Sequence, residues 1–171
     1  PWFLYLLLAP FLLKSCFAAR SLEEHTLAVV AALKDGIGNG REQVQLLVSR
    51  NTAQLDRQHI LSAGYESMTE NLTDSIISPL LFFSVFGLAG AAVYRAANTM
   101  DAMLGYRDER ERIGWCPARM DDLFNYIPAR VTVLLLLVYF AFHGRFSPAL
   151  RMVHRDGKKR PGFNGGIVMA A

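Results

Sequence analysis

Three carboxylates at four-residue spacing stand directly before a long apolar stretch. They are Glu66, Glu70 and Asp74, and the block 76–97 follows. On a helix, residues at i, i+4 and i+8 lie on one face, so these like charges repel unless a cation lies between them. The spacing fits a solvated helix face, and it also fits a site for Mg²⁺ or for a cationic ligand, because carboxylates suit hard cations that carry phosphates. Acids at the edge of a membrane favour the functional interpretation.

A second group of acids lies further along the chain. Asp121 and Asp122 are adjacent, and Asn125 lies four residues after Asp121, on the same helical face. Adjacent acids point apart, so only one of the two need face a site. Asp101, preceded one turn earlier by Asn98, is a third candidate.

Three arginines in polar surroundings are candidates for holding anions. They are Arg50, Arg119 and Arg130, and arginine binds phosphate or carboxylate through two parallel hydrogen bonds. Arg130 adjoins an apolar block, where an unpaired charge would be costly. No Gly-x-Ser-x-Gly, His-Glu-x-x-His, Cys-x-x-Cys or Walker motif occurs, so triad, zinc and P-loop chemistry have no support. No basic stripe with interleaved aromatics occurs either, so no nucleic-acid partner is expected.

The apolar residues that must position these groups are gathered in blocks. The chain is 52% hydrophobic with a mean hydropathy of +0.21, which is typical of a membrane protein. We expect an all-α, multi-pass protein of the cell (inner) membrane, with residues 1–171 as part of one membrane domain. Since the chain starts at Pro1 and stops inside a new apolar run, we expect an internal fragment. The expected spans are about 2–19, 76–97 and 127–143, with a fourth beginning near 165.

The segments between the blocks are predicted to be helical. Residues 21–34 are amphipathic, the glycine-rich segment 35–40 is expected to be a plain turn, and 41–49 a short helix. Asn51 or Thr52 is expected to cap the helix that carries the acids.

The topology of the blocks presents a puzzle. If all three cross the membrane, 20–75 and 144–164 share one side and 98–126 lies opposite. The first pair carries eleven Lys and Arg against four, which favours the cytoplasm for that pair. The two groups of acids would then lie on opposite sides. Either the chemistry takes place at membrane depth, or one block is re-entrant, and 76–97, with its proline and glycines, is the suspect.

Five motifs in order carry a resemblance to a known family. The chain resembles the CbiB/CobD family of cobalamin biosynthesis in Arg50-Asn-Thr-Ala-Gln-Leu-Asp56, Glu66-x-x-x-Glu70-Asn71-Leu-x-Asp74, Asn98-Thr-Met-Asp101-x-Met-x-Gly105-Tyr106, Ala118-Arg119-x-Asp121-Asp122-x-x-Asn125-Tyr-Ile-Pro128-Ala-Arg130 and Asp156-x-x-x-x-Pro161-x-x-Asn164-Gly165. Two positions depart from the family's usual pattern. Asn51 replaces an acid, and Ser75 replaces a glycine, which predicts a more regular helix after Asp74.

The resemblance implies an adenosylcobinamide-phosphate synthase, a multi-pass membrane ligase. Such an enzyme joins adenosylcobyric acid to aminopropanol, or to its phosphate, through an amide bond, with ATP as co-substrate and Mg²⁺ as cofactor. Other corrinoid-pathway membrane enzymes and membrane lipid are the further partners expected. The alternatives are an AmpE-like membrane signalling or regulatory protein and a corrinoid transporter.

For that reaction, the candidate residues fall into three groups. The catalytic candidates are Glu66, Glu70, Asp121 and Asp122. The Mg²⁺ ligands are Glu70 and Asp74. The substrate- or phosphate-binding candidates are Arg50, Asn71, Asn98, Asp101, Arg119, Asn125, Arg130 and, from the basic loop, Lys158.

Overall fold

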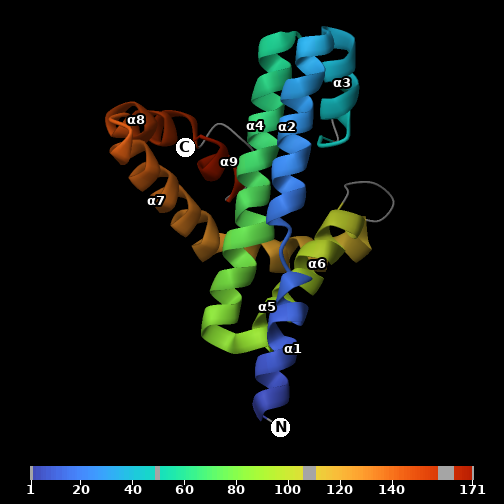
Figure 1. Ribbon diagram of the computed structural model, residues 1–171, viewed down its shortest axis with the longest axis vertical. Helices are drawn as coiled ribbons and strands as arrows, with labels where there is room; N and C mark the ends of the chain where they lie inside the picture. The colour runs from blue at the N-terminus through green and yellow to red at the C-terminus, as the bar shows by residue number, and fades with distance from the viewer. Residues whose placement is uncertain (1, 49–50, 106–110, 158–163, 171) are drawn as a thin grey trace. The chain divides into compact units, whose positions relative to one another are not determined.

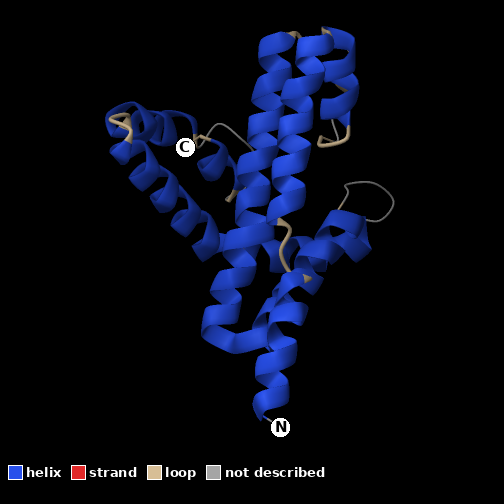
Figure 2. Cartoon of the chain, in the orientation of Figure 1, coloured by secondary structure: helices blue, strands red, loops and turns tan. Residues whose placement is uncertain are grey.

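The protein is helical throughout the part of the chain that the structure describes. A computed structural model describes residues 2–48, 51–105, 111–157 and 164–170. No strand occurs in these ranges (Figure 2), which confirms the all-α prediction. The chain divides into two compact units. One unit combines Pro1–Ala18 with Thr73–Ala171, and we call it the hairpin unit. The other, Ala19–Leu72, we call the three-helix unit.

The three-helix unit is built on an ordinary apolar core. Helices α2 (Ala19–Asp35), α3 (Ile37–Gln45) and α4 (Arg57–Leu72) lie side by side (Figure 1). The buried side chains are Val29, Leu33, Val44, Ile60 and Ala63. Val29 and Leu33 lie one turn apart on α2, as the amphipathic pattern predicts.

Two local predictions in this unit are wrong. The glycine-rich segment is mostly helical, because α3 begins at Ile37 and only Gly36, with φ of 147°, has a conformation that favours glycine. Helix α4 is capped by Asp56, whose Oδ1 accepts a hydrogen bond of 2.9 Å from the backbone N–H of His59. That bond also holds the pKa of Asp56 below its usual value.

The two residues expected to form that cap have other partners. The Thr52 hydroxyl lies 3.0 Å from the Arg41 carbonyl oxygen and 2.9 Å from Gln45 Oε1. Asn51 Oδ1 accepts from the Ala53 N–H in a turn. Both residues therefore hold the loop before α4, not the helix itself.

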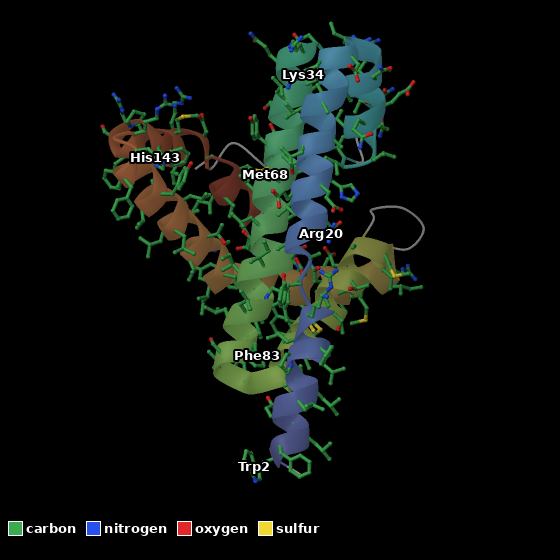
Figure 3. All side chains as sticks on the ribbon, viewed as in Figure 1. Trp2, Arg20, Lys34, Met68, Phe83 and His143 are labelled. Atoms are coloured by element: carbon green, nitrogen blue, oxygen red, sulfur yellow. The ribbon has the colours of Figure 1, made fainter. Side chains whose placement is uncertain are left out.

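The hairpin unit contains the apolar blocks. Its elements are α1 (Trp2–Lys14), a π-helical turn η1 (Thr73–Ile77), α5 (Ser78–Leu104), α6 (Glu111–Phe124), α7 (Tyr126–Phe142), α8 (Phe146–Asp156) and α9 (Gly165–Met169). Helix α7 coincides closely with the predicted span 127–143, and α9 begins where the fourth span is expected. Trp2 is the first residue of α1, and His143 directly follows α7 (Figure 3).

Length and composition mark several helical stretches as able to cross a membrane. Among the described residues, Trp2–Asp35 and Arg57–Leu104 are long and apolar enough. The pair Arg112–Phe124 and Tyr126–Phe142, bent by 44°, makes a third if it forms one span. The bend falls at Asn125, just before Pro128, whose ring disfavours a regular helix in the preceding turn.

The π-helical turn η1 has an identifiable cause in Pro79. This residue has no N–H, so the Ser75 carbonyl four residues earlier lacks its usual helical donor. The Ser75 oxygen accepts instead from the Ala18 N–H, at 3.1 Å. The helix is thus continuous after Asp74 but widened, and the expectation of a more regular helix there is wrong.

Helix α5 doubles back on itself at Gly87. This residue has φ of 66° and ψ of −159°, a conformation available to glycine and costly for other residues. Phe82 stacks on Tyr94 with ring centroids 5.2 Å apart, although twelve residues of straight helix would separate them by roughly 18 Å. Residues 73–104 therefore form a helical hairpin, whose two arms meet near Gly87 (Figure 1).

Candidate functional site

Asn125 is the centre of a buried polar network between the hairpin arms and the bend from α6 to α7. It is 3% exposed. Its Oδ1 accepts from the hydroxyls of Ser78, at 2.6 Å, and Tyr94, at 2.9 Å. Its Nδ2 donates to Asp121 Oδ2 at 3.0 Å. Both lone pairs of the amide oxygen are thus used, and the reverse orientation of the amide would place its oxygen against the carboxylate.

Asp121 is held from two sides by amide groups. Asn98 Nδ2 donates to its Oδ1 at 3.1 Å, while Asn125 Nδ2 occupies its Oδ2. Arg95 Nη1 in turn donates to Asn98 Oδ1 at 3.3 Å, which orients that amide. The carboxylate of Asp121 therefore has a fixed direction within the hairpin unit.

Asp101 and Asp122 lie close enough to Asp121 for their charges to interact. The carboxylates of Asp121 and Asp122 both repel that of Asp101, which is half-buried. Asp122 itself has an exposed side chain. Three acids that repel one another in a partly desolvated setting favour the binding of a cation.

Arg130 is tied to the segment that leads into α9. Its Nη1 donates to Asn164 Oδ1 at 2.9 Å and to the Tyr126 carbonyl at 2.6 Å. The guanidinium carbon lies 3.6 Å from the centre of the Tyr126 ring, a cation–π contact. Asn164 Nδ2 donates to the Asp122 backbone oxygen at 2.7 Å. The arginine and the second acid group are thus connected through one asparagine.

Asp74 joins the network at the first arm of the hairpin. The Tyr94 hydroxyl lies 3.3 Å from the Asp74 carbonyl oxygen, and the Asp74 carboxylate is near enough to act electrostatically on Tyr94. A few turns of helix thus collect most of the candidates of this unit in one place: Asp74, Asn98, Asp101, Asp121, Asp122, Asn125 and Arg130.

The other candidates belong to other parts of the chain. Glu66, Glu70 and Asn71 belong to the three-helix unit. Glu66 Oε1 accepts from the Ser62 hydroxyl at 2.8 Å, and Asn71 Nδ2 donates to its own helix at the Ser67 carbonyl. Arg119 is exposed on α6. Arg50 and Lys158 lie outside the described residues.

Sequence reasoning missed three members of the network: Ser78, Tyr94 and Asn164. A signal was present for the first two. Tyr94 precedes Asn98 by four residues and Asp101 by seven, so the three share a helical face, and Ser78 follows Asp74 by four. The signal was hidden because both residues lie inside an apolar block. Asn164 shows no such spacing, and its signal was its place in the fifth motif of the resemblance, where it was not named as a site residue.

The described residues fit a Mg²⁺ ion that comes with phosphates better than an ion held by protein alone. Within the described ranges, no three or more His, Cys, Asp or Glu side chains converge as a metal site. Mg²⁺ usually takes one or two carboxylates plus substrate phosphates, which does not require such a cage. The repulsion among Asp101, Asp121 and Asp122 suits a cation of this kind.

The fold and the network together define an all-helical protein with apolar helices, a helical hairpin and a buried acid–amide site. Comparison with known proteins supplies the family. The sequence profile described as CobD/Cbib protein matches residues 1–171, so the chain belongs to the CobD/CbiB family. This confirms the resemblance found in the five motifs.

Three curated relatives carry the name "Probable cobalamin biosynthesis protein CobD". The protein from Methanothermobacter thermautotrophicus is 41% identical over 98% of this chain and 57% of its own length. The protein from Thermococcus kodakarensis is 54% identical over 86% of this chain and 49% of its own length. The protein from Pyrococcus abyssi is 54% identical over 78% of this chain and 45% of its own length. The chain thus spans about half the length of these relatives. No solved structure matches it.

Proposed function

We propose that the full-length protein is an enzyme of cobalamin biosynthesis that forms an amide bond. It attaches aminopropanol, or aminopropanol phosphate, to the free propionate of adenosylcobyric acid. The observation that carries the proposal is the family match along all 171 residues, together with curated relatives named for cobalamin biosynthesis. The acid–amide network supports it, because the network gathers several of the motif residues on which the resemblance rests.

The proposed reaction needs activation of a carboxylate. The propionate takes the terminal phosphoryl group of ATP, and ADP leaves. The ammonium then loses one proton, and the free amine attacks the carbonyl carbon and forms a C–N bond. The C–O bond to the phosphate breaks, inorganic phosphate leaves, and the nitrogen loses its second proton to the departing phosphate. Negative charge grows on the acyl oxygen and on the phosphate, so fixed hydrogen-bond donors and cations nearby would lower the barrier.

The chain's own residues divide these tasks in the proposal. Arg130 has a fixed guanidinium and would orient a phosphate or the propionate. Asp121, held by two amides, would position the cationic amine. Glu66 would take the proton from the attacking ammonium, a role that requires its pKa to lie near the working pH. Arg50, Arg119 and Lys158 would attract the anionic substrates.

Mg²⁺ is the cofactor that fits this division. When bound, it would neutralise charge on the phosphate oxygens during phosphoryl transfer. Glu70 and Asp74 remain the proposed ligands, with Asp121 or Asp122 contributing, and Asp101, Asn71, Asn98 and Asn125 would orient ligands or substrate nearby. A site of this kind in a protein with apolar helices would lie in or at the inner membrane, where a large amphipathic corrinoid can approach it.

Complementation tests the proposal directly. A strain that lacks the aminopropanol-joining step is supplied with cobyric acid and the full-length gene. We expect growth with the wild type and with Glu42→Ala, a control that removes an exposed glutamate of α3. We expect growth to be lost with Glu70→Ala and with Asp122→Ala while both proteins persist in the membrane. Failure of the wild type to complement would refute the proposed reaction, and growth with both variants would refute the proposed residues.

A further inference from the structure

The helical hairpin brings the two ends of an uncharged segment together. Residues 75–94 contain no Asp, Glu, Lys or Arg. As a straight helix, the twenty residues from Asp74 to Tyr94 would extend roughly 30 Å, the thickness of the hydrocarbon core of a membrane. Instead, the Tyr94 hydroxyl lies 3.3 Å from the Asp74 carbonyl oxygen. A segment long enough to cross a bilayer therefore returns to its starting level.

The interior of the hairpin explains why the arms stay together. Ser78 on the first arm and Tyr94 on the second both donate to Asn125 Oδ1. Nearer the turn, Gly90 allows close contact. A methyl group added there would lie 2.8 Å from the Phe82 carbonyl oxygen on the other arm. Small residues permit this approach of two helices in lipid.

The outer face of the hairpin has the opposite character. Val85 and Phe86, beside the turn, are 65% and 66% exposed, and Val93 on the second arm is 54% exposed. A face of this kind is typical of contact with lipid. The arms reach the network at Ser78, nine residues before Gly87, and at Tyr94, seven residues after it. These lengths are roughly 10–14 Å of helix, which is within half of the hydrocarbon core.

We propose that residues 73–104 form a re-entrant hairpin that inserts into one leaflet and returns to the side from which it entered. The apolar tip around Val85 and Phe86 contacts lipid acyl chains, and the polar network lies where the hairpin enters. The segments 20–75 and 98–126 then lie on the same side of the membrane. The two groups of acids, which three full crossings would separate, become available to one compartment. This inference about topology does not depend on the proposed amide-forming reaction.

Cysteine labelling of the full-length protein tests the inference. The native Cys16 and Cys116 are first replaced by serine, and single cysteines are introduced at the exposed positions Ser62 and Arg112. A membrane-impermeant maleimide is applied to sealed vesicles of known orientation. We expect Ser62→Cys and Arg112→Cys to react from the same side. Reaction from opposite sides would mean that the segment crosses the membrane, and would overturn the proposal.

A second pair of variants tests the lipid contact. Val85→Cys, at the tip, is compared with Leu46→Cys, an apolar residue of similar exposure in the three-helix unit, which is 73% exposed. We expect Leu46→Cys to react with the reagent and Val85→Cys to resist it from both sides until detergent is added. Ready labelling of Val85→Cys in intact vesicles would place the tip in water and refute insertion. The amount of each variant in the membrane and its unfolding temperature, compared with those of the wild type, show that the labelled protein is folded, so the labelling result holds whether or not the proposed reaction is correct.

Discussion

The two units of the chain both contain an apolar cluster, but they differ in the polar side chains that they bury and in the apolar ones that they expose. The three-helix unit encloses aliphatic residues such as Val44 and Ile60, both 0% exposed, and many of its polar side chains bond locally. The hairpin unit encloses Ser78, Tyr94 and Asn125, while Phe86 and Phe142 are 66% and 86% exposed. The first arrangement is that of a protein in water. The second arrangement suits a lipid surrounding, where polar groups must find hydrogen-bond partners inside the protein and apolar side chains face the lipid.

The comparison also separates stability from chemistry. The network of the hairpin unit contains carboxylates, amides and hydroxyls in long-range bonds, and no buried side-chain N or O of the described residues lacks a hydrogen-bond partner. Damage to the apolar core of the three-helix unit should therefore reduce folding, and damage to the network should reduce activity more than folding.

The largest effect on stability is expected in the apolar core. Ile60→Ala should lower the free energy of unfolding of the three-helix unit by about 2–5 kcal/mol, through lost burial and the cavity left behind. Thermal unfolding of the full-length protein in detergent measures this. The turnover of the molecules that remain folded should be unchanged, and a large loss of turnover per folded molecule would break the separation between the two units.

The next largest effect is expected at the centre of the network. Asn125→Leu keeps the branched shape of the side chain but deprives Ser78, Tyr94 and Asp121 of a shared partner, and a buried polar group left unpaired costs about 1–3 kcal/mol. We expect cobinamide formation to be lost together with part of the stability. Asn39→Leu, at an exposed asparagine of α3 outside the five motifs, is the control and should leave cobinamide formation unchanged. Equal activity in the two variants would contradict the importance of the network.

A smaller effect is expected where the hairpin arms touch. Gly90→Ala places a methyl group against the Phe82 carbonyl and the Phe86 side chain, and overpacking of this kind costs about 1–3 kcal/mol. Gly38→Ala is the control, since a methyl group there meets no atom within 4 Å. The unfolding temperature of Gly90→Ala should be clearly lower than that of Gly38→Ala. If they are the same, the arms are not in close contact.

The smallest effect is expected at a hydroxyl pair beside the network. The Thr73 hydroxyl donates to that of Thr132 at 3.0 Å, and Thr132 donates to the Pro128 carbonyl. Thr132→Val should cost about 1 kcal/mol, since hydrogen bonds inside membrane proteins average near that value or below. A double-mutant cycle with Thr73→Val measures the coupling. Strictly additive effects would show that the two hydroxyls do not interact.

Local sequence patterns predicted much of this fold, and long-range bonds account for what they missed. Helical periodicity placed Val29 and Leu33 in a core and Asp121 beside Asn125, because those relations span one turn. The proline and glycines of 76–97 made that block the suspect for re-entry. Whether it reverses depends on Ser78 and Tyr94 reaching an asparagine 47 and 31 residues away, which periodicity does not encode.

The cap of α4 and the turn η1 show the same limit at shorter range. Three polar residues, Asn51, Thr52 and Asp56, precede the helix, and each is chemically able to cap it. Asp56 forms the cap because the hydroxyl of Thr52 already bonds to groups in α3. The π-helical turn depends in the same way on Ala18, which supplies the donor that Pro79 lacks.

The direct test of the account is the turnover of Asp121→Asn in the purified full-length protein. The assay measures formation of the amide from adenosylcobyric acid and aminopropanol phosphate with ATP and Mg²⁺. Asp56→Asn, which alters an exposed acid of the three-helix unit, is the control. We expect Asp121→Asn to reduce turnover by roughly 100-fold or more, as loss of a fixed charge near the reacting atoms does. The unfolding temperature should fall only slightly, because one of the two amide donors that Asp121 binds loses its acceptor. Turnover equal to that of Asp56→Asn would contradict the claim that this network carries the proposed reaction.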